Sequence, residues 1–442
     1  MSTPRANSLV LTLLTIIGLG IALVGCSQPT VAPTATSTPP EPTSIPTSTP
    51  TTIPPTPTKE PVLLKVWIMD RVGTTAMAEV KAVIEAWAVE TGNKVEITEG
   101  NQFEMLNKIP VAIPAGEGPD VFMTLNNYLG GHYAAKLIVP IEDALPQSEQ
   151  AKYTQGSLNA FTLDGHLLGI PIAADVNALV YNKALVSTPP QTMDDVLAMA
   201  KEFKGSDKYA LLFPIDNFWY SYPFFSAYGG YIFKWTEDGW DPTDVGFYNP
   251  GAIEGLTYLR DLVEKEKLMP ADVTWDVMNG LFTEGKVAMI ITNPMTIPSY
   301  KDAGIQIGVT RIPKTPNGVY PRPLATYTGF SVSAYSEHPE ESASLVKYLG
   351  VNLPTRIYKA NPGNIPVLSD ILNDPSVKAD EELAGWLSQL EESDPLPSIN
   401  EMNFVWGPAT SAFQSVVRGS DTPENALKAA QEAILKAIQE NK

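Results

Sequence analysis

The sequence predicts an α/β protein with two lobes, on two observations. Apolar strands alternate with amphipathic helices along the chain, the order typical of open α/β sheets. The part that alternates in this way covers about 380 residues, which is more than one compact core usually holds. The hydrophobic fraction of 44% and the charged fraction of 18% are those of a globular protein.

The expected elements begin at residue 62. Residues 62–68 form an apolar strand, and the apolar residues of 76–91 recur at the spacing of a helix, which Gly92 ends. Further strands are expected at 94–97, after the Gly118-Pro119-Asp120 turn, and at 168–172, 178–182, 287–291 and 305–310. Further helices are expected at 187–203, 252–265, 339–349 and 423–439, and the last two have acidic first turns that suit the helix dipole.

The N-terminal region predicts export and anchoring. Arg5 precedes an apolar run over 9–24, which closes with Leu23-Val24-Gly25-Cys26. This ending resembles the lipobox of bacterial lipoproteins. The resemblance implies removal of residues 1–25, acylation of Cys26 and an extracytoplasmic protein anchored to a membrane as a lipoprotein. An ordinary signal peptide, or a signal anchor with an incidental cysteine, is the alternative. Residues 27–61 are nearly all Pro, Thr and Ser, which predicts that 26–61 is a disordered, extended stalk.

Composition and motifs narrow the function classes. The net charge of −19 argues against nucleic acid as a partner. The single cysteine excludes an intrachain disulfide, and no metal-ligand, nucleotide-binding or nucleophile motif is present, so no cofactor or metal is expected. His132, beside two glycines, is expected in a turn or on the surface. The 49 carboxylates leave glycoside hydrolysis open as an alternative, because sequence spacing does not show how far apart two carboxyls lie.

Aromatic residues gather in what we expect to be loops. Residues 216–225 (DNFWYSYPFF) lack the alternation of a helix or a strand. Trp275 follows a loop at the start of a helix, and Trp406 lies in an aromatic turn that enters a helix. Sugar rings stack their C–H faces on such side chains, so these two residues and Trp219 are interpreted as platforms in a cleft. Core packing is the alternative, and we prefer it for Phe224 and Phe225.

Several longer segments resemble one known family. They are AEVKAVIEAWAVETGNKVEI, GEGPDVFMTLNNYLGGHYAAKLIVPI, GIPIAADVNALVYNKAL, ALLFPIDNFWYSYPFFSAYGGYIFK, GLTYLRDLVEKEKLMPAD, LFTEGKVAMIITNPM, GFSVSAYSEHPE and TPENALKAAQEAI. Over essentially all of 62–442 the chain resembles the extracellular solute-binding proteins of ABC importers, in their maltose/maltodextrin-binding branch. GPD and YNK are general to that superfamily, whereas AYGGYIFK and LMPAD are more particular to the branch.

The resemblance implies a two-lobe periplasmic-binding-protein-like fold of type II, whose lobes are joined by hinge crossovers. Lobe 1 would comprise 62–173 plus 325–373, and lobe 2 would comprise 178–324 plus 374–442. A monomer would bind an oligosaccharide between the lobes without catalysis and would deliver it to an ABC permease in the membrane.

The resemblance also implies a set of ligand-binding residues, carried over position by position. The sugar platforms would be Trp219, Trp275 and Trp406, with Tyr220 beside the first. Asp175 falls where the family has a glutamate that hydrogen-bonds sugar hydroxyls. Asp70 and Arg71 fall in a loop that usually supplies an Asp–Lys pair.

The chain departs from the family pattern at six positions in this region. Thr124 and Met295 stand where the family has tryptophans, Asn127 and Tyr128 where it has an Asp-Arg pair, Asn217 where it has a glutamate, and Thr410 where it has an arginine. Neutral hydrogen bonds, which are about half as strong as charged ones, therefore replace charged ones. Sugar binding is still expected, but the ligand is left open among maltodextrins, cyclodextrins, other oligosaccharides and a polyol or other small solute. A purely structural surface protein is the remaining alternative.

Overall fold

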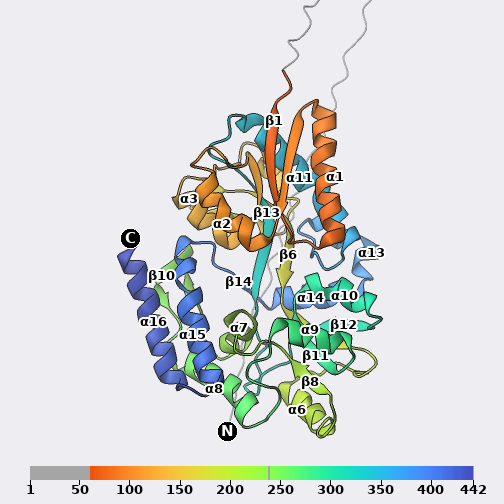
Figure 1. Cartoon of the computed structure of the whole chain (residues 1–442), viewed down its shortest axis with the longest axis vertical. Coiled ribbons are helices and arrows are strands. Elements are labelled where there is room, and N and C mark those ends of the chain that lie inside the picture. Colours follow the sequence, from red (N-terminus) through yellow and green to blue (C-terminus); the bar gives the residue numbers. More distant parts are fainter. Residues whose placement is uncertain (1–59, 237–238, 442) are drawn as a thin grey trace, which may run out of the picture. The chain divides into compact units, whose positions relative to one another are not determined.

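The computed structural model describes residues 60–236 and 239–441, so Cys26 and nearly all of the predicted stalk lie outside the described residues. Among the described residues, no helix is both long and apolar enough to cross a membrane. Two β-sheets frame the described part of the chain, and helices pack against each of them (Figure 1).

The larger sheet has the order β14-β13-β3-β1-β2, and β6 pairs with the other edge of β13. Its strands are β1 (Leu63–Met69), β2 (Lys94–Gly100), β3 (Val121–Leu125), β6 (Ile170–Val176), β13 (Leu324–Val332) and β14 (Asp394–Pro395). β1 runs parallel to β2 and β3, whereas β13 runs antiparallel to β3 and β6. Every residue of β13 is buried, so this strand forms the centre of the sheet.

The smaller sheet has the order β12-β7-β11-β8. Its strands are β7 (Ala178–Asn182), β8 (Tyr209–Leu212), β11 (Val287–Thr292) and β12 (Ile307–Thr310). Two short hairpins accompany the sheets: β4 (Thr162–Leu163) with β5 (His166–Leu167), and β9 (Phe233–Thr236) with β10 (Gly239–Val245). The expected strands at 94–97, 178–182, 287–291 and 305–310 are confirmed to within a few residues.

Each sheet is covered mainly by its own set of helices, although α14 also contacts β6. α1 packs on α11, and α11 packs on β6 and β13, whereas α6, α9 and α14 pack on β8, β11 and β12 (Figure 1). The long helices are α1 (Thr74–Thr91), α2 (Gln102–Ala112), α6 (Met193–Glu202), α7 (Phe218–Ala227), α8 (Pro250–Glu264), α9 (Trp275–Thr283), α11 (Pro339–Ala360), α14 (Glu381–Glu391), α15 (Trp406–Val417) and α16 (Pro423–Glu440). The shorter ones are η1 (Asn126–Tyr128), α3 (Leu129–Ala134), α4 (Gln147–Gln150), α5 (Gln155–Phe161), η2 (Pro294–Thr296), α10 (Ile297–Asp302), α12 (Ser369–Asn373), α13 (Pro375–Lys378) and η3 (Asn400–Phe404).

Local sequence signals account for several of these helix ends. Gly92 ends α1 with a φ of 73°, which a residue with a side chain rarely adopts. Thr192 starts α6 with a capping box, because its hydroxyl accepts from the Asp195 N–H and the Asp195 carboxylate accepts from the Thr192 N–H. The acidic first turns expected for α11 and α16 are confirmed.

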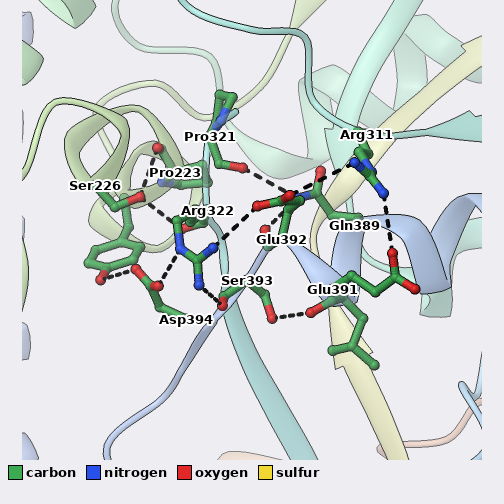
Figure 2. A network of polar contacts seen from close by, with 12 residues as sticks. Pro223, Ser226, Arg311, Pro321, Arg322, Gln389, Glu391, Glu392, Ser393 and Asp394 are labelled. Atoms are coloured by element: carbon green, nitrogen blue, oxygen red, sulfur yellow. Dashed lines mark hydrogen bonds and ion pairs between the residues drawn. The ribbon is translucent and has the colours of Figure 1, made fainter. Parts of the chain in front are cut away.

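The chain crosses between the sheets at closely spaced points. β6 leads into β7 through one residue, while segment 311–323 joins β12 to β13 and segment 392–393 joins α14 to β14. A polar network ties the last two crossings together (Figure 2). The Arg322 guanidinium donates to the Asp394 carboxylate at 2.7 Å and to the Ser393 carbonyl at 2.6 Å, and the Tyr222 hydroxyl of α7 donates to the same carboxylate at 2.8 Å.

The prediction that 216–225 is a loop is wrong, because residues from Phe218 onward form α7. Of its ten residues only Trp219 and Ser226 are not buried. A helix that is enclosed on almost every side needs no polar face, and it therefore shows no 3.6-residue periodicity. Phe224 and Phe225 are fully buried, which confirms their assignment to the core.

The expectation that His132 lies in a turn or on the surface is also wrong. His132 belongs to α3 and is 3% exposed, with the Phe122 ring edge-on at 5.7 Å. Among the described residues neither of its ring nitrogens has a hydrogen-bond partner. Because burial disfavours the charged imidazolium, it lowers the pKa of His132 to about 4.

This lowered pKa predicts a loss of stability in acid. Between pH 6.5 and about 4 the unfolded chain takes up a proton at His132 that the folded chain does not, so stability falls as the pH falls through this window. The loss should reach about 3 kcal/mol near pH 4. The measurement is the free energy of unfolding in urea at pH 7, 5.5 and 4.5. His132→Phe should remove the pH-dependent loss of stability, whereas the control His166→Gln, at an exposed position, should retain it. Identical pH profiles for wild type and His132→Phe would contradict the assignment.

Candidate functional site

The site begins where the strands of the larger sheet end. Arg71 follows β1, and Asp175 is the next-to-last residue of β6, where it lies opposite Thr326 of β13. The Arg71 guanidinium donates to the Asp175 carboxylate and, at 3.2 Å, to the Thr326 hydroxyl. The two charged side chains are only 11% and 12% exposed, so this is a buried ion pair.

Asn127 lies on an element that neighbours β13. It belongs to η1, which begins where β3 ends and contacts β13. The preceding residue, Asn126, holds η1 in place, because its amide accepts from the Tyr327 N–H and donates to the Leu396 carbonyl, both at 3.0 Å. η1, β13 and β6 are neighbouring elements. We call the residues Asn127, Thr326 and Asp175 that they carry, together with Arg71, the polar row.

Arg71 of this row also reaches an element that follows the smaller sheet. Met295, in η2 just after β11, accepts a hydrogen bond at its sulfur from Arg71 Nη1 at 3.5 Å. Tyr220 of α7 is 8% exposed and lies within electrostatic range of Asp175 and Arg71. Arg71 is therefore a common partner of both halves of the described fold.

The electrostatics of the polar row are balanced. Burial raises the pKa of Asp175, while the adjacent Arg71 guanidinium acts in the opposite direction. Burial, and secondarily the Asp175 carboxylate, raise the pKa of Tyr220, which therefore remains a neutral hydroxyl. The pair of opposite charges leaves the row without a net charge that would attract an ionic ligand.

Two atoms of the polar row lack partners. Within the described residues, Asp175 Oδ1 and Asn127 Oδ1 are buried and accept no hydrogen bond. Buried oxygens of this kind are normally paired, since an unpaired one costs free energy. Both atoms are acceptors, so the row is suited to the hydroxyl donors of a ligand.

An aromatic pair adjoins the polar row through α7. Asn217 caps this helix, with its side chain accepting from the Trp219 N–H at 2.9 Å. The rings of Trp219 and Trp406 lie 6.4 Å apart at 45°, and the buried Phe218 supports Trp406 edge-on at 6.0 Å. Both tryptophans are half-buried, which leaves part of each ring available for stacking.

The other predicted contacts lie at the margins. Trp275 is 44% exposed at the start of α9, and Asp70 is exposed, with its carboxylate accepting from the Gln102 N–H at 2.7 Å. Tyr128 is half-buried, 6.1 Å from the His132 ring. The described structure thus brings together Arg71, Asp175, Tyr220 and Met295 in one group and Trp219, Trp406 and Asn217 in another.

The structure adds Thr326 to the residues named from sequence. No pattern in the sequence marks this residue, because only the pairing of β13 with β6 in the folded protein places it opposite Asp175. At the departures from the family pattern, Thr124 is fully buried in β3 and offers no surface for stacking, and Thr410 is half-buried on α15.

A separate cavity of about 1160 Å³ lies beside the two hairpins, lined by Tyr231, Trp235, Trp240 and the Tyr222–Asp394 pair among others. It contains none of the residues predicted for the site. Because Tyr222 and Asp394 already bond to each other, we place the candidate site at the polar row, where oxygens are unpaired.

Known proteins resemble this chain in sequence and in fold. Residues 82–385 match the family model described as bacterial extracellular solute-binding protein. The chain belongs to this family.

Its relatives include a galactooligosaccharide-binding protein of Bacillus subtilis, 30% identical over 80% of this chain and 85% of that protein. A maltotriose-binding protein of Pyrococcus abyssi is 30% identical over 78% of this chain and 76% of that protein. Among solved structures, a cyclo/maltodextrin-binding protein complexed with maltotetraose has a TM-score of 0.77 and 32% identity, covering 86% of this chain and 98% of that chain. These similarities confirm the type II periplasmic-binding-protein-like fold expected from the sequence.

The buried ion pair generates a prediction about stability. Arg71→Met should lower the free energy of unfolding by about 3 kcal/mol or more, because the Asp175 carboxylate then stays buried without its partner. Adding Asp175→Asn should recover part of this loss, since the orphaned charge is removed. Urea unfolding of the wild type, both single variants and the double variant measures the coupling. Costs that add within about 0.5 kcal/mol would show that the pair is not coupled.

Proposed function

We propose that this chain is the solute-binding component of an ABC importer and that it captures a short, uncharged oligosaccharide outside the cell. One observation carries the proposal: the charge-balanced polar row and the Trp219–Trp406 pair adjoin each other through α7. Tryptophan rings bind the apolar faces of sugars, and buried polar groups bind their hydroxyls. The names of the relatives, which bind galacto-oligosaccharides or maltodextrins, support the same ligand class.

The local chemistry favours a neutral ligand over an ionic one. Arg71 is already neutralised by Asp175, and the nearby predicted contacts Asn127 and Asn217 are uncharged amides. A peptide or amino acid would need separate charged partners for its amino and carboxylate groups. A maltodextrin is the leading candidate, and a galacto-oligosaccharide is the second, because it is named for a relative that is 30% identical.

The proposed mechanism is binding without catalysis. Two lobes, 62–173 plus 325–373 and 178–324 plus 374–442, would close around the sugar by bending at the crossings next to Asp175 and Arg322. The strands support this division, since β1, β2 and β3 fall in lobe 1 and the strands of the smaller sheet fall in lobe 2. β6 and β13 also lie in lobe 1 except at the ends that lead into the crossings. The closed monomer would then dock on a permease. A ligand favours closure only through contacts that the open form lacks.

Titration with a panel of sugars tests this function. Maltotriose, maltoheptaose, cyclodextrins, galactotriose, cellobiose, xylobiose and trehalose would be added while tryptophan fluorescence is followed. We expect a saturable change with a maltodextrin or galactotriose, and none with the trehalose control. No response to any sugar in the panel would overturn the proposal.

Two tryptophan variants test where on the protein the sugar binds. Trp406→Ala should weaken binding about tenfold or more, as loss of a stacking anchor does. Trp386→Ala is the matched control, because Trp386 on α14 is 1% exposed; it should cost about 3–5 kcal/mol of stability and leave the affinity of the folded protein unchanged. The reverse pattern would show that Trp406 belongs to the core.

We also propose that acylated Cys26 anchors the protein, a role supported by the lipoproteins among its relatives. In expressing cells, Cys26→Ser should prevent incorporation of labelled palmitate and release the protein from the membrane fraction. Membrane retention of this variant, resistant to high salt, would instead identify the apolar run at 9–24 as the anchor.

A further inference from the structure

Asn177 is a buried amide at the crossing between the two sheets. It is the single residue that separates β6 from β7, and it is 1% exposed. Within the described part of the chain, neither its amide oxygen nor its amide nitrogen has a hydrogen-bond partner. A buried primary amide that leaves both a donor and an acceptor unpaired is unusual, and the position was not among the residues predicted from sequence.

Asn177 lies close to the polar row along the chain. β6 ends at Val176 and β7 begins at Ala178, so a single residue separates Asn177 from Asp175. Asp175 meets Arg71 and Thr326 near the end of β6, and Asn177 therefore lies within two residues of that contact. Asp175 Oδ1 is unpaired as well, so segment 175–177 offers two acceptors and one donor group without partners.

We propose that Asn177 contacts the ligand and determines specificity by bonding two neighbouring hydroxyls of one sugar ring. Its amide oxygen accepts from one hydroxyl, and its amide N–H donates to the next, while Asp175 Oδ1 accepts from the same ring. This inference rests on the proposed function and adds to it a requirement for vicinal hydroxyls. Because the crossing joins the sheets, a ring held there contacts the chain at its hinge.

A purely structural role predicts different behaviour. If the amide is only a tolerated polar group in the core, an apolar side chain of similar size should leave ligand affinity unchanged, since replacing an unpaired polar group is neutral or stabilising. If the amide bonds the ligand, the same replacement should weaken binding without destabilising the ligand-free protein.

The experiment compares Asn177→Leu with a matched control. Asn182, at the end of β7, is 4% exposed, but its Oδ1 accepts from the Ala184 N–H at 2.9 Å. The full chain and both variants, purified in detergent, would be titrated with maltotriose and galactotriose, and thermal unfolding would be recorded without sugar. Asn177→Leu should bind the sugar that the wild type binds about tenfold more weakly and unfold at an unchanged or higher temperature. Asn182→Leu should unfold at a lower temperature and keep its affinity.

Three results would overturn the inference. Affinity of Asn177→Leu within twofold of wild type would show that the amide does not touch the ligand. Tighter binding by this variant would show that the amide only penalises the ligand-free arrangement. A wild-type chain that binds no sugar of the panel would overturn the proposed function and this inference with it, so the wild-type titration separates the two failures.

Discussion

The burial of one ion pair is the constraint on which the candidate site depends. Removing the Arg71 and Asp175 side chains from water is costly, and only close pairing with further hydrogen bonds offsets that cost. The end of β1 must therefore approach the end of β6, and Thr326 of β13 completes the contact. Since the guanidinium also reaches Met295, the same requirement brings the two halves of the fold together at this point.

The helix α7 relates this pair to the aromatic surface. Its first turn places Tyr220 near Asp175, while the neighbouring Trp219 faces Trp406. The rest of the helix is enclosed by phenylalanine rings, which fix its orientation. A rigid, apolar helix thus carries a polar contact and a stacking surface in successive residues, and neither can move without the other. This rigidity favours recognition of a ligand that has both apolar faces and polar edges.

Much of the fold could be predicted from sequence, because its elements carry local signals. α1 has helical periodicity and a glycine stop, and β7 was predicted with its observed bounds. β13 gave no such signal, because a strand buried on both faces shows no alternation. The same cause hid α7. At the site, the resemblance pointed to Arg71 and Asp175 as separate contacts, but their pairing and the role of Thr326 arise from strand register, which single residues do not encode.

The loss of charged contacts relative to the family pattern has a consistent physical consequence. A neutral hydrogen bond is weaker than a charged one, so affinity at this site must come from several neutral bonds and from stacking. The unpaired atoms of Asp175 and Asn127 then matter more than their individual strength suggests, because they disfavour a compact arrangement that lacks a ligand. Hydroxyls that satisfy them relieve this penalty as well as adding bonds. A ligand whose hydroxyls satisfy these oxygens therefore stabilises the arrangement in which they are buried, and a solute without hydroxyls leaves the penalty in place.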